Sequence, residues 1–218
     1  MLFDIDGTLM KESPTHTYSF EYVCEKVYGV KVDAFNFPRH GMTDRGIIYG
    51  LLRNGGLSDD EIKQKINDAI NLMGSYFVEN IKEYDYELLP GVIDLLGSLS
   101  SLNIKIGVIT GNIKAVANAR LEKAGILKFF TTGAYGDEDT VRSNLVKLAV
   151  KRAGQNIYRV FVVGDTPLDI EAAIQADTIP VGVATGKYGI NELENAELKL
   201  QNFNYSEINR FISYIKKE

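Results

Sequence analysis

The heptapeptide FDIDGTL, residues 3–9, constrains the fold and the chemistry of this chain more than any other stretch. Successive side chains of an extended segment alternate in direction, so Asp4 and Asp6 lie on one face, and Gly7 then allows the chain to turn. Two adjacent carboxylates repel each other unless a cation lies between them. Mg²⁺ takes carboxylate ligands together with water and phosphate oxygens. The same residues also suit a simple turn at a strand end, so the motif alone leaves both interpretations open.

Outward from this motif, from about residue 91 onward, short apolar runs alternate with longer amphipathic ones. The pattern predicts strands at 104–109, 129–134, 158–163 and 178–183, and helices at 113–124, 141–153, 168–176 and 205–215. Strands that alternate with helices form a parallel sheet covered on both faces. The predicted fold class is therefore α/β, with a Rossmann-like parallel sheet core.

The stretch between residues 11 and 86 interrupts this alternation because it contains no convincing strand. Helices are predicted at 17–28, 43–52 and 59–81, and the sequence SDDE at 58–61 is a capping signal for the last of them. We therefore expect an all-helical cap domain, residues 14–86, inserted directly after the first strand. Residues 1–13 and 87–218 would form the Rossmann-like core.

Composition excludes several classes of protein. The net charge of −5 does not favour binding to nucleic acid or to an anionic membrane, because both require basic patches. The single cysteine, Cys24, permits neither an intramolecular disulfide nor a cysteine metal cluster. No apolar run approaches the ~20 residues of a membrane span, and Asp4 interrupts what would be a signal-peptide core. We expect a cytoplasmic monomer or homodimer with no nucleic-acid or membrane partner.

A second motif, Thr110-Gly111-Asn112, follows the predicted strand at 104–109. It places a hydroxyl at the strand end, just before a helix whose first N–H groups are free to bind an anion. These three residues are candidates for binding phosphate. Taken alone, the motif is more typical of a simple helix N-cap.

A third motif, GDTPLD at residues 164–169, follows the fully apolar strand at 158–163. Asp165 lies at the strand end, and Asp169 lies four residues later, within reach of the same site if a helix begins near Pro167. Helix capping is an equal alternative for Asp169 and a weaker one for Asp165. Ligands of an open parallel sheet bind at the carboxyl ends of strands near a topological switch point. The three motifs together therefore describe a magnesium–phosphate site.

In this order, the three motifs resemble the haloacid dehalogenase-like hydrolase superfamily, in its phosphoglycolate-phosphatase-like branch with a helical cap. The resemblance covers nearly the whole chain. It implies that Asp4 is the nucleophile, that Asp6 is the general acid and base, and that Thr110 holds the transferring phosphoryl group. It also implies that Asp165, assisted by Asp169, holds Mg²⁺ beside Asp4 and the carbonyl of Asp6.

One departure from that family concerns a cation. The family usually supplies a lysine, often in a Lys-Pro pair, before the fourth strand, and no Lys-Pro occurs in this chain. Helical spacing places Arg142 on the apolar face of the helix at 141–153, together with Leu145, Val146 and Ala149. It places Lys147 on a polar face with Ser143, Asn144 and Lys151. We therefore predict that Arg142 supplies the cation, with Lys147 as the alternative; a surface ion pair of Arg142 with Asp137 or Asp139 is the competing interpretation.

The predicted insertion carries weaker candidates. The sequence GMTDR at 41–45 resembles a segment that faces the active site in this branch, which makes Thr43 a candidate for substrate binding; an N-capped helix is the equal alternative. Arg39 and Arg45 could contact an acidic substrate group, although solvated surface arginines are the more common case. His16 and His40 are expected to be surface or cap residues rather than catalysts.

The combined motifs predict a magnesium-dependent phosphatase that acts on a small phosphorylated metabolite through an aspartyl phosphate on Asp4. A sugar phosphomutase shares all the core motifs and stays open. A phosphonate hydrolase also stays open. It would need a lysine in the site, and the short loop after Leu9 offers only Lys11. From a different class, a non-catalytic phospho-acceptor or binding module is the remaining alternative.

Overall fold

The computed structural model describes residues 1–155 and 157–217. Its centre is a six-stranded parallel sheet formed by β1 (Leu2–Phe3), β2 (Gly107–Ile109), β3 (Thr132–Ala134), β4 (Phe161–Gly164), β5 (Ile179–Val183) and β6 (Leu198–Leu200). The spatial order is β3-β2-β1-β4-β5-β6. This order confirms the predicted α/β class, and it places the topological switch point between β1 and β4.

Eight α-helices accompany the sheet in the described residues: α1 (Pro14–Tyr28), α2 (Asp44–Asn54), α3 (Asp59–Asn80), α4 (Val92–Ser101), α5 (Lys114–Lys123), α6 (Arg142–Ala153), α7 (Pro167–Gln175) and α8 (Tyr205–Ile215). The strand at 198–200 and the helix at 92–101 were not predicted. A three-residue run such as LKL is too short to show a period, and the predicted strands at 104–109 and 158–163 pair over fewer residues than their apolar runs suggest.

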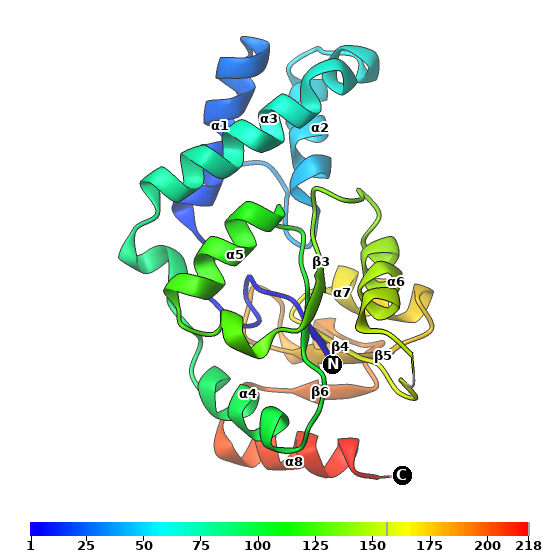
Figure 1. Cartoon of the computed structure of the whole chain (residues 1–218). Helices are drawn as coiled ribbons and strands as arrows, with labels where there is room; N and C mark the ends of the chain where they lie inside the picture. The colour runs from blue at the N-terminus through cyan, green and yellow to red at the C-terminus, as the bar shows by residue number, and fades with distance from the viewer. Residues whose placement is uncertain (156, 218) are drawn as a thin grey trace.

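Alternating strand side chains separate the two faces of the sheet. Phe3 and Val163 belong to an apolar cluster with α4, α5 and α8, whereas Leu2 and Val162 belong to a cluster with α6 and α7. The two groups of helices lie on opposite sides of the strands (Figure 1). This is the covered parallel sheet that the sequence predicts.

Helices α1, α2 and α3 gather on one side of the molecule, beyond α5 (Figure 1). They share an apolar cluster that includes Phe20 of α1, Ile48 of α2 and Phe77 of α3. Ile113 and Val116 of the α5 segment join this cluster. The structure describes every residue from 14 to 84, and none of them forms a strand. Ser58 and Glu61 form the predicted capping box of α3.

Two chain segments connect these three helices to the sheet, and they are bonded to each other. The Lys11 N–H donates to the Glu87 carbonyl at 3.0 Å, and the Leu89 N–H donates to the Leu9 carbonyl at 3.0 Å. The Ser13 hydroxyl donates to the buried Asp85 carboxylate at 2.6 Å. None of the helices in the described residues is long and apolar enough to cross a membrane.

Candidate active site

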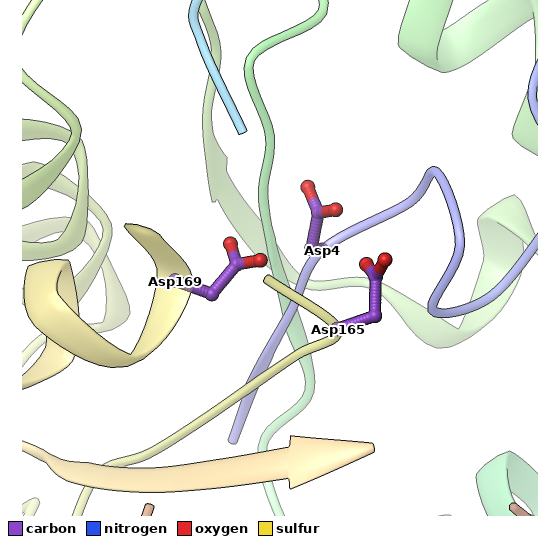
Figure 2. Close-up of side chains that lie close together, drawn as sticks. All are labelled: Asp4, Asp165 and Asp169. Atoms are coloured by element: carbon purple, nitrogen blue, oxygen red, sulfur yellow. The ribbon is translucent and has the colours of Figure 1, made fainter. Parts of the chain in front are cut away.

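Three buried carboxylates converge at the switch point of the sheet. Asp4 follows β1, Asp165 follows β4, and Asp169 lies in the first turn of α7. One carboxylate oxygen of each lies within 4.8 Å of the others, and Figure 2 shows the three side chains pointing toward a common space. Strands β1 and β4 are neighbours in the sheet, and the Asp4 N–H donates to the Val163 carbonyl at 3.0 Å. The strand order therefore brings Asp4 and Asp165 together from positions far apart in the sequence.

Local contacts fix the carboxylates of Asp165 and Asp169. The Thr8 hydroxyl donates to Asp165 Oδ1 at 3.0 Å. Thr166 caps α7 and donates to Asp169 Oδ2 through its hydroxyl at 2.6 Å and its N–H at 3.0 Å. Asp169 is thus a capping residue and a member of the cluster at once. Gly7 has φ +73°, and a Cβ there would lie 2.3 Å from Asp165, so only glycine fits this turn.

Burial and mutual repulsion make this cluster unfavourable for negative charge. Burial, opposed by Arg142 and reinforced by Asp169 and Asp6, raises the pKa of Asp4 to about 7. Burial together with the charges of Asp169 and Asp4 raises the pKa of Asp165 to about 9. Groups in this state become fully ionised when a cation binds among them. Three buried carboxylates are also the oxygen donors that Mg²⁺ takes, so the residues present fit that ion.

Arg142 lies against this cluster at the start of α6. Its Nη2 lies 2.7 Å from Asp4 Oδ1 and also contacts Asp169, and its Nη1 donates to the Gly41 carbonyl at 3.2 Å. The two carboxylates raise the pKa of Arg142, although burial opposes them, so the guanidinium stays charged. Lys147, in contrast, is exposed.

One neighbour on this helix differs from the prediction. Ser143, expected to face water with Lys147, is buried. Helix α7 packs against α6, and Ser143 lines a cavity with Leu168 and Glu171 of α7, so the buried face is wider than the apolar pattern alone indicates.

Asp6 lies beside this cluster and has its own cation. Arg120 Nη1 lies 2.7 Å from Asp6 Oδ1, and Asn112 Nδ2 donates to Asp6 Oδ2 at 2.7 Å. Burial raises the pKa of Asp6, but the charges of Arg120 and His16 and the Asn112 hydrogen bond outweigh it and lower the pKa. Asp6 is therefore ionised in the free site, and an incoming phosphoryl dianion would favour its protonated form.

The predicted phosphate loop shows a division of roles. Gly111 and Asn112 line the cavity, whereas Thr110 is fully buried and its hydroxyl accepts the Asn112 N–H at 3.1 Å. A Cβ on Gly111 would lie 2.1 Å from the Met42 carbonyl oxygen, so glycine permits this close approach. Thr43 caps α2 by accepting the Gly46 N–H at 3.2 Å, and it does not line this cavity.

The cavity itself lies between the strand ends and the helical segment and has a volume of about 70 Å³. Sequence reasoning missed part of its wall. His16 is buried on α1 and its Nε2 lies 2.8 Å from Asp44 Oδ2, while Asp44 also accepts the Ile113 N–H at 2.7 Å. Arg39 and His40 line the cavity as well, whereas Arg45 does not.

The sequence model of the haloacid dehalogenase-like hydrolases matches residues 1–183. The chain belongs to this family. Among curated proteins, phosphoglycolate phosphatase of Synechococcus elongatus is 24% identical, over 85% of this chain and 84% of its own length. Pyrophosphatase PpaX of Oceanobacillus iheyensis is 27% identical, over 89% of this chain and 87% of its own.

Solved structures share the fold along nearly the whole chain. CbbY from Rhodobacter sphaeroides has a TM-score of 0.74 at 22% identity and covers 93% of both chains. β-Phosphoglucomutase from Clostridium difficile has a TM-score of 0.71 at 23% identity and covers 97% of both chains. At these identities the likeness concerns the fold alone.

Proposed function

We propose that this chain is a magnesium-dependent phosphatase that hydrolyses a small phosphorylated metabolite through an aspartyl phosphate on Asp4. The observation that carries the proposal is the convergence of Asp4, Asp165 and Asp169 beside Arg142 and Asp6, at the switch point of the sheet. The phosphoglycolate phosphatase and pyrophosphatase relatives support the reaction class.

The chemistry follows from the positions of two carboxylates. Asp4 attacks phosphorus and forms a new O–P bond, while the bond from phosphorus to the leaving oxygen breaks and Asp6 gives that oxygen its proton. Water then attacks the aspartyl phosphate and Asp6 takes its proton, which restores Asp4 and releases inorganic phosphate. Arg142 offsets the negative charge between Asp4 and the phosphoryl oxygens.

Asp4, Asp165, Asp169 and the backbone of Asp6 would hold Mg²⁺, whose charge would offset that of the carboxylates and the phosphoryl oxygens. Gly111, Asn112 and Thr110 form the loop proposed to hold the phosphoryl group. Thr43, in the helical segment, is proposed to assist this loop in binding the substrate.

The cavity supports a small substrate. One water molecule needs ~10–15 Å³ of such volume, so about 70 Å³ holds a phosphoryl group and few further atoms. We propose that residues 1–13 and 87–218 are the hydrolase core and that residues 14–86 are a cap that closes over the site and selects the substrate. His16, Arg39 and His40 line the cavity from the side of this proposed cap.

Chelation is expected to abolish phosphate release, and Mg²⁺ is expected to restore it. The reason is that the three buried carboxylates repel a phosphoryl group unless a cation binds among them. Release of inorganic phosphate from p-nitrophenyl phosphate, with no acceptor sugar present, measures hydrolysis rather than transfer. Full activity after exhaustive chelation would contradict the metal assignment.

A second readout of the same prediction does not depend on activity. Mg²⁺ should raise the midpoint of thermal unfolding of the wild type, because it binds the native state. In Asp165→Asn this shift should disappear. The exposed carboxylate of Asp94, on α4, provides the control, since Asp94→Asn should retain the shift.

Arg142→Ala is expected to reduce turnover at least ~10²-fold, as removal of a group that stabilises transition-state charge does. Lys147→Ala should leave turnover within about twofold, because Lys147 is exposed and does not line the cavity. Steady-state kinetics of both variants, with their unfolding midpoints, make the comparison. The reverse ranking would mean that Lys147 is the cation of the site.

A further inference from the structure

We propose that Arg120 is a positioning residue for Asp6, holding its carboxylate in the orientation that proton transfer requires. The inference rests on the proposed function, in which Asp6 is the general acid and base. No motif points to Arg120: it lies in the last turn of α5, eight residues beyond the phosphate loop. What singles it out is the combination of complete burial and the partners that its guanidinium selects.

Arg120 is fully buried, with 0% of its surface exposed. A buried guanidinium is tolerated only when it is paired and its donors are satisfied. Its partners are Asp6 Oδ1 at 2.7 Å and Asn112 Oδ1 at 3.1 Å from Nη1, the Lys11 carbonyl at 2.6 Å from Nη2, and the Asp85 carbonyl at 2.9 Å from Nε. The only carboxylate among these contacts, within the described chain, belongs to Asp6.

The contacts form a closed triangle around Asp6. Arg120 donates to one carboxylate oxygen of Asp6, and Asn112 donates to the other through Nδ2. Arg120 also donates to Oδ1 of Asn112. These contacts fix the rotation of the Asp6 carboxylate and the orientation of the Asn112 amide. Proton transfer depends strongly on the distance and angle of the donor, so a carboxylate held at both oxygens is an oriented acid and base.

The remaining bonds of Arg120 anchor it to both connecting segments. Lys11 and Asp85 lie on the two crossings between the sheet and the helices α1–α3, and the Ser13 hydroxyl bridges those crossings by donating to Asp85. The two connecting segments therefore fix the guanidinium of Arg120 through the carbonyls of Lys11 and Asp85, and the guanidinium in turn fixes the carboxylate of Asp6. A lysine in its place would offer no planar fork and could not hold three directions at once.

A series of substituted phenyl phosphates tests this inference in the presence of Mg²⁺. The value of kcat/KM reports transfer to Asp4, and poor leaving groups need a proton from Asp6 whereas activated ones do not. In Arg120→Met, kcat/KM for phenyl phosphate should fall about 10²-fold, the typical contribution of a positioned acid, and that for the most activated ester less than about tenfold. The plot of log kcat/KM against leaving-group pKa should therefore be steeper than in the wild type.

Three further outcomes decide the matter. An equal loss for every ester would mean that Arg120 supports only the fold, and would overturn the inference. If Arg120→Met gives no soluble protein, Arg120→Lys decides: an intermediate slope supports the positioning role, and the wild-type slope overturns it. Arg152→Met is the matched control, since Arg152 lies on α6, is partly exposed and pairs with Glu138 outside the site. Its slope should equal that of the wild type.

The proposed function fails separately from the assignment of Arg120. A wild-type protein that hydrolyses none of these esters with Mg²⁺ would remove the phosphatase proposal, and the role of Arg120 with it. A wild type that hydrolyses them, beside an Arg120→Met variant with an unchanged slope, removes the role of Arg120 alone.

Discussion

Asp4→Asn is expected to lower turnover by at least about three orders of magnitude, the scale seen when a catalytic nucleophile is removed. An amide cannot attack phosphorus as a carboxylate does, and it is a poorer ligand for Mg²⁺. The variant should still fold, because Arg142 keeps its contact with Asp169 and one negative charge leaves a cluster of three. Phosphate release with Mg²⁺ present measures the loss.

The covalent step has its own measurement. Wild-type protein quenched in acid during turnover should carry one phosphoryl group, visible by mass spectrometry, and the modified peptide should contain Asp4. Asp4→Asn should carry none. Turnover near the wild-type rate in this variant, or a phosphoryl group on another residue, would remove the aspartyl-phosphate mechanism.

The fold follows from local patterns where those patterns are long enough. The helical periods at 113–124 and 205–215 predict helices that the structure contains almost unchanged. The apolar runs at 104–109, 129–134, 158–163 and 178–183 predict strands in the right places, although the first three strands pair over fewer residues. Strand β6 escaped prediction because three residues carry no measurable period. Helix α4 follows Leu89-Pro90-Gly91, where the capping Gly91 has a positive φ and no side chain with which to signal a helix start.

The site was partly visible in the sequence because a parallel sheet gathers its strand ends. Asp4 and Asp165 meet through the neighbouring strands β1 and β4, and Arg142 contacts Asp4 and Asp169 from the buried face of α6. The same helical spacing places Arg120 on the buried face of α5 with Val116, Ala117 and Leu121, so one signal for it was present. Its contacts with Asp6 and Lys11 were not predicted, because these residues lie more than a hundred positions away in the sequence and no motif links them to Arg120.

Asp6→Asn is expected to lower turnover ~10²–10⁴-fold, the contribution of a positioned acid and base. An amide of the same shape can neither give a proton to the leaving oxygen nor take one from water. The effect should differ between the two half-reactions. An activated aryl phosphate needs no proton on its leaving group, so Asp4 should still become phosphorylated, whereas hydrolysis of the aspartyl phosphate lacks its base.

This difference separates Asp6 from Asp4 in a single experiment. With p-nitrophenyl phosphate, Asp6→Asn should release about one equivalent of nitrophenol in a burst and then turn over slowly, whereas Asp4→Asn should show no burst.

Thermal stability should separate the two variants as well. Asp6→Asn leaves the fully buried Arg120 facing a neutral amide, whereas Asp4→Asn leaves Arg142 paired with Asp169, so Asp6→Asn should unfold at the lower temperature. Wild-type turnover in Asp6→Asn would assign the proton transfers to another group. The positioning role of Arg120 would then fail as well, because it depends on Asp6 as the acid and base.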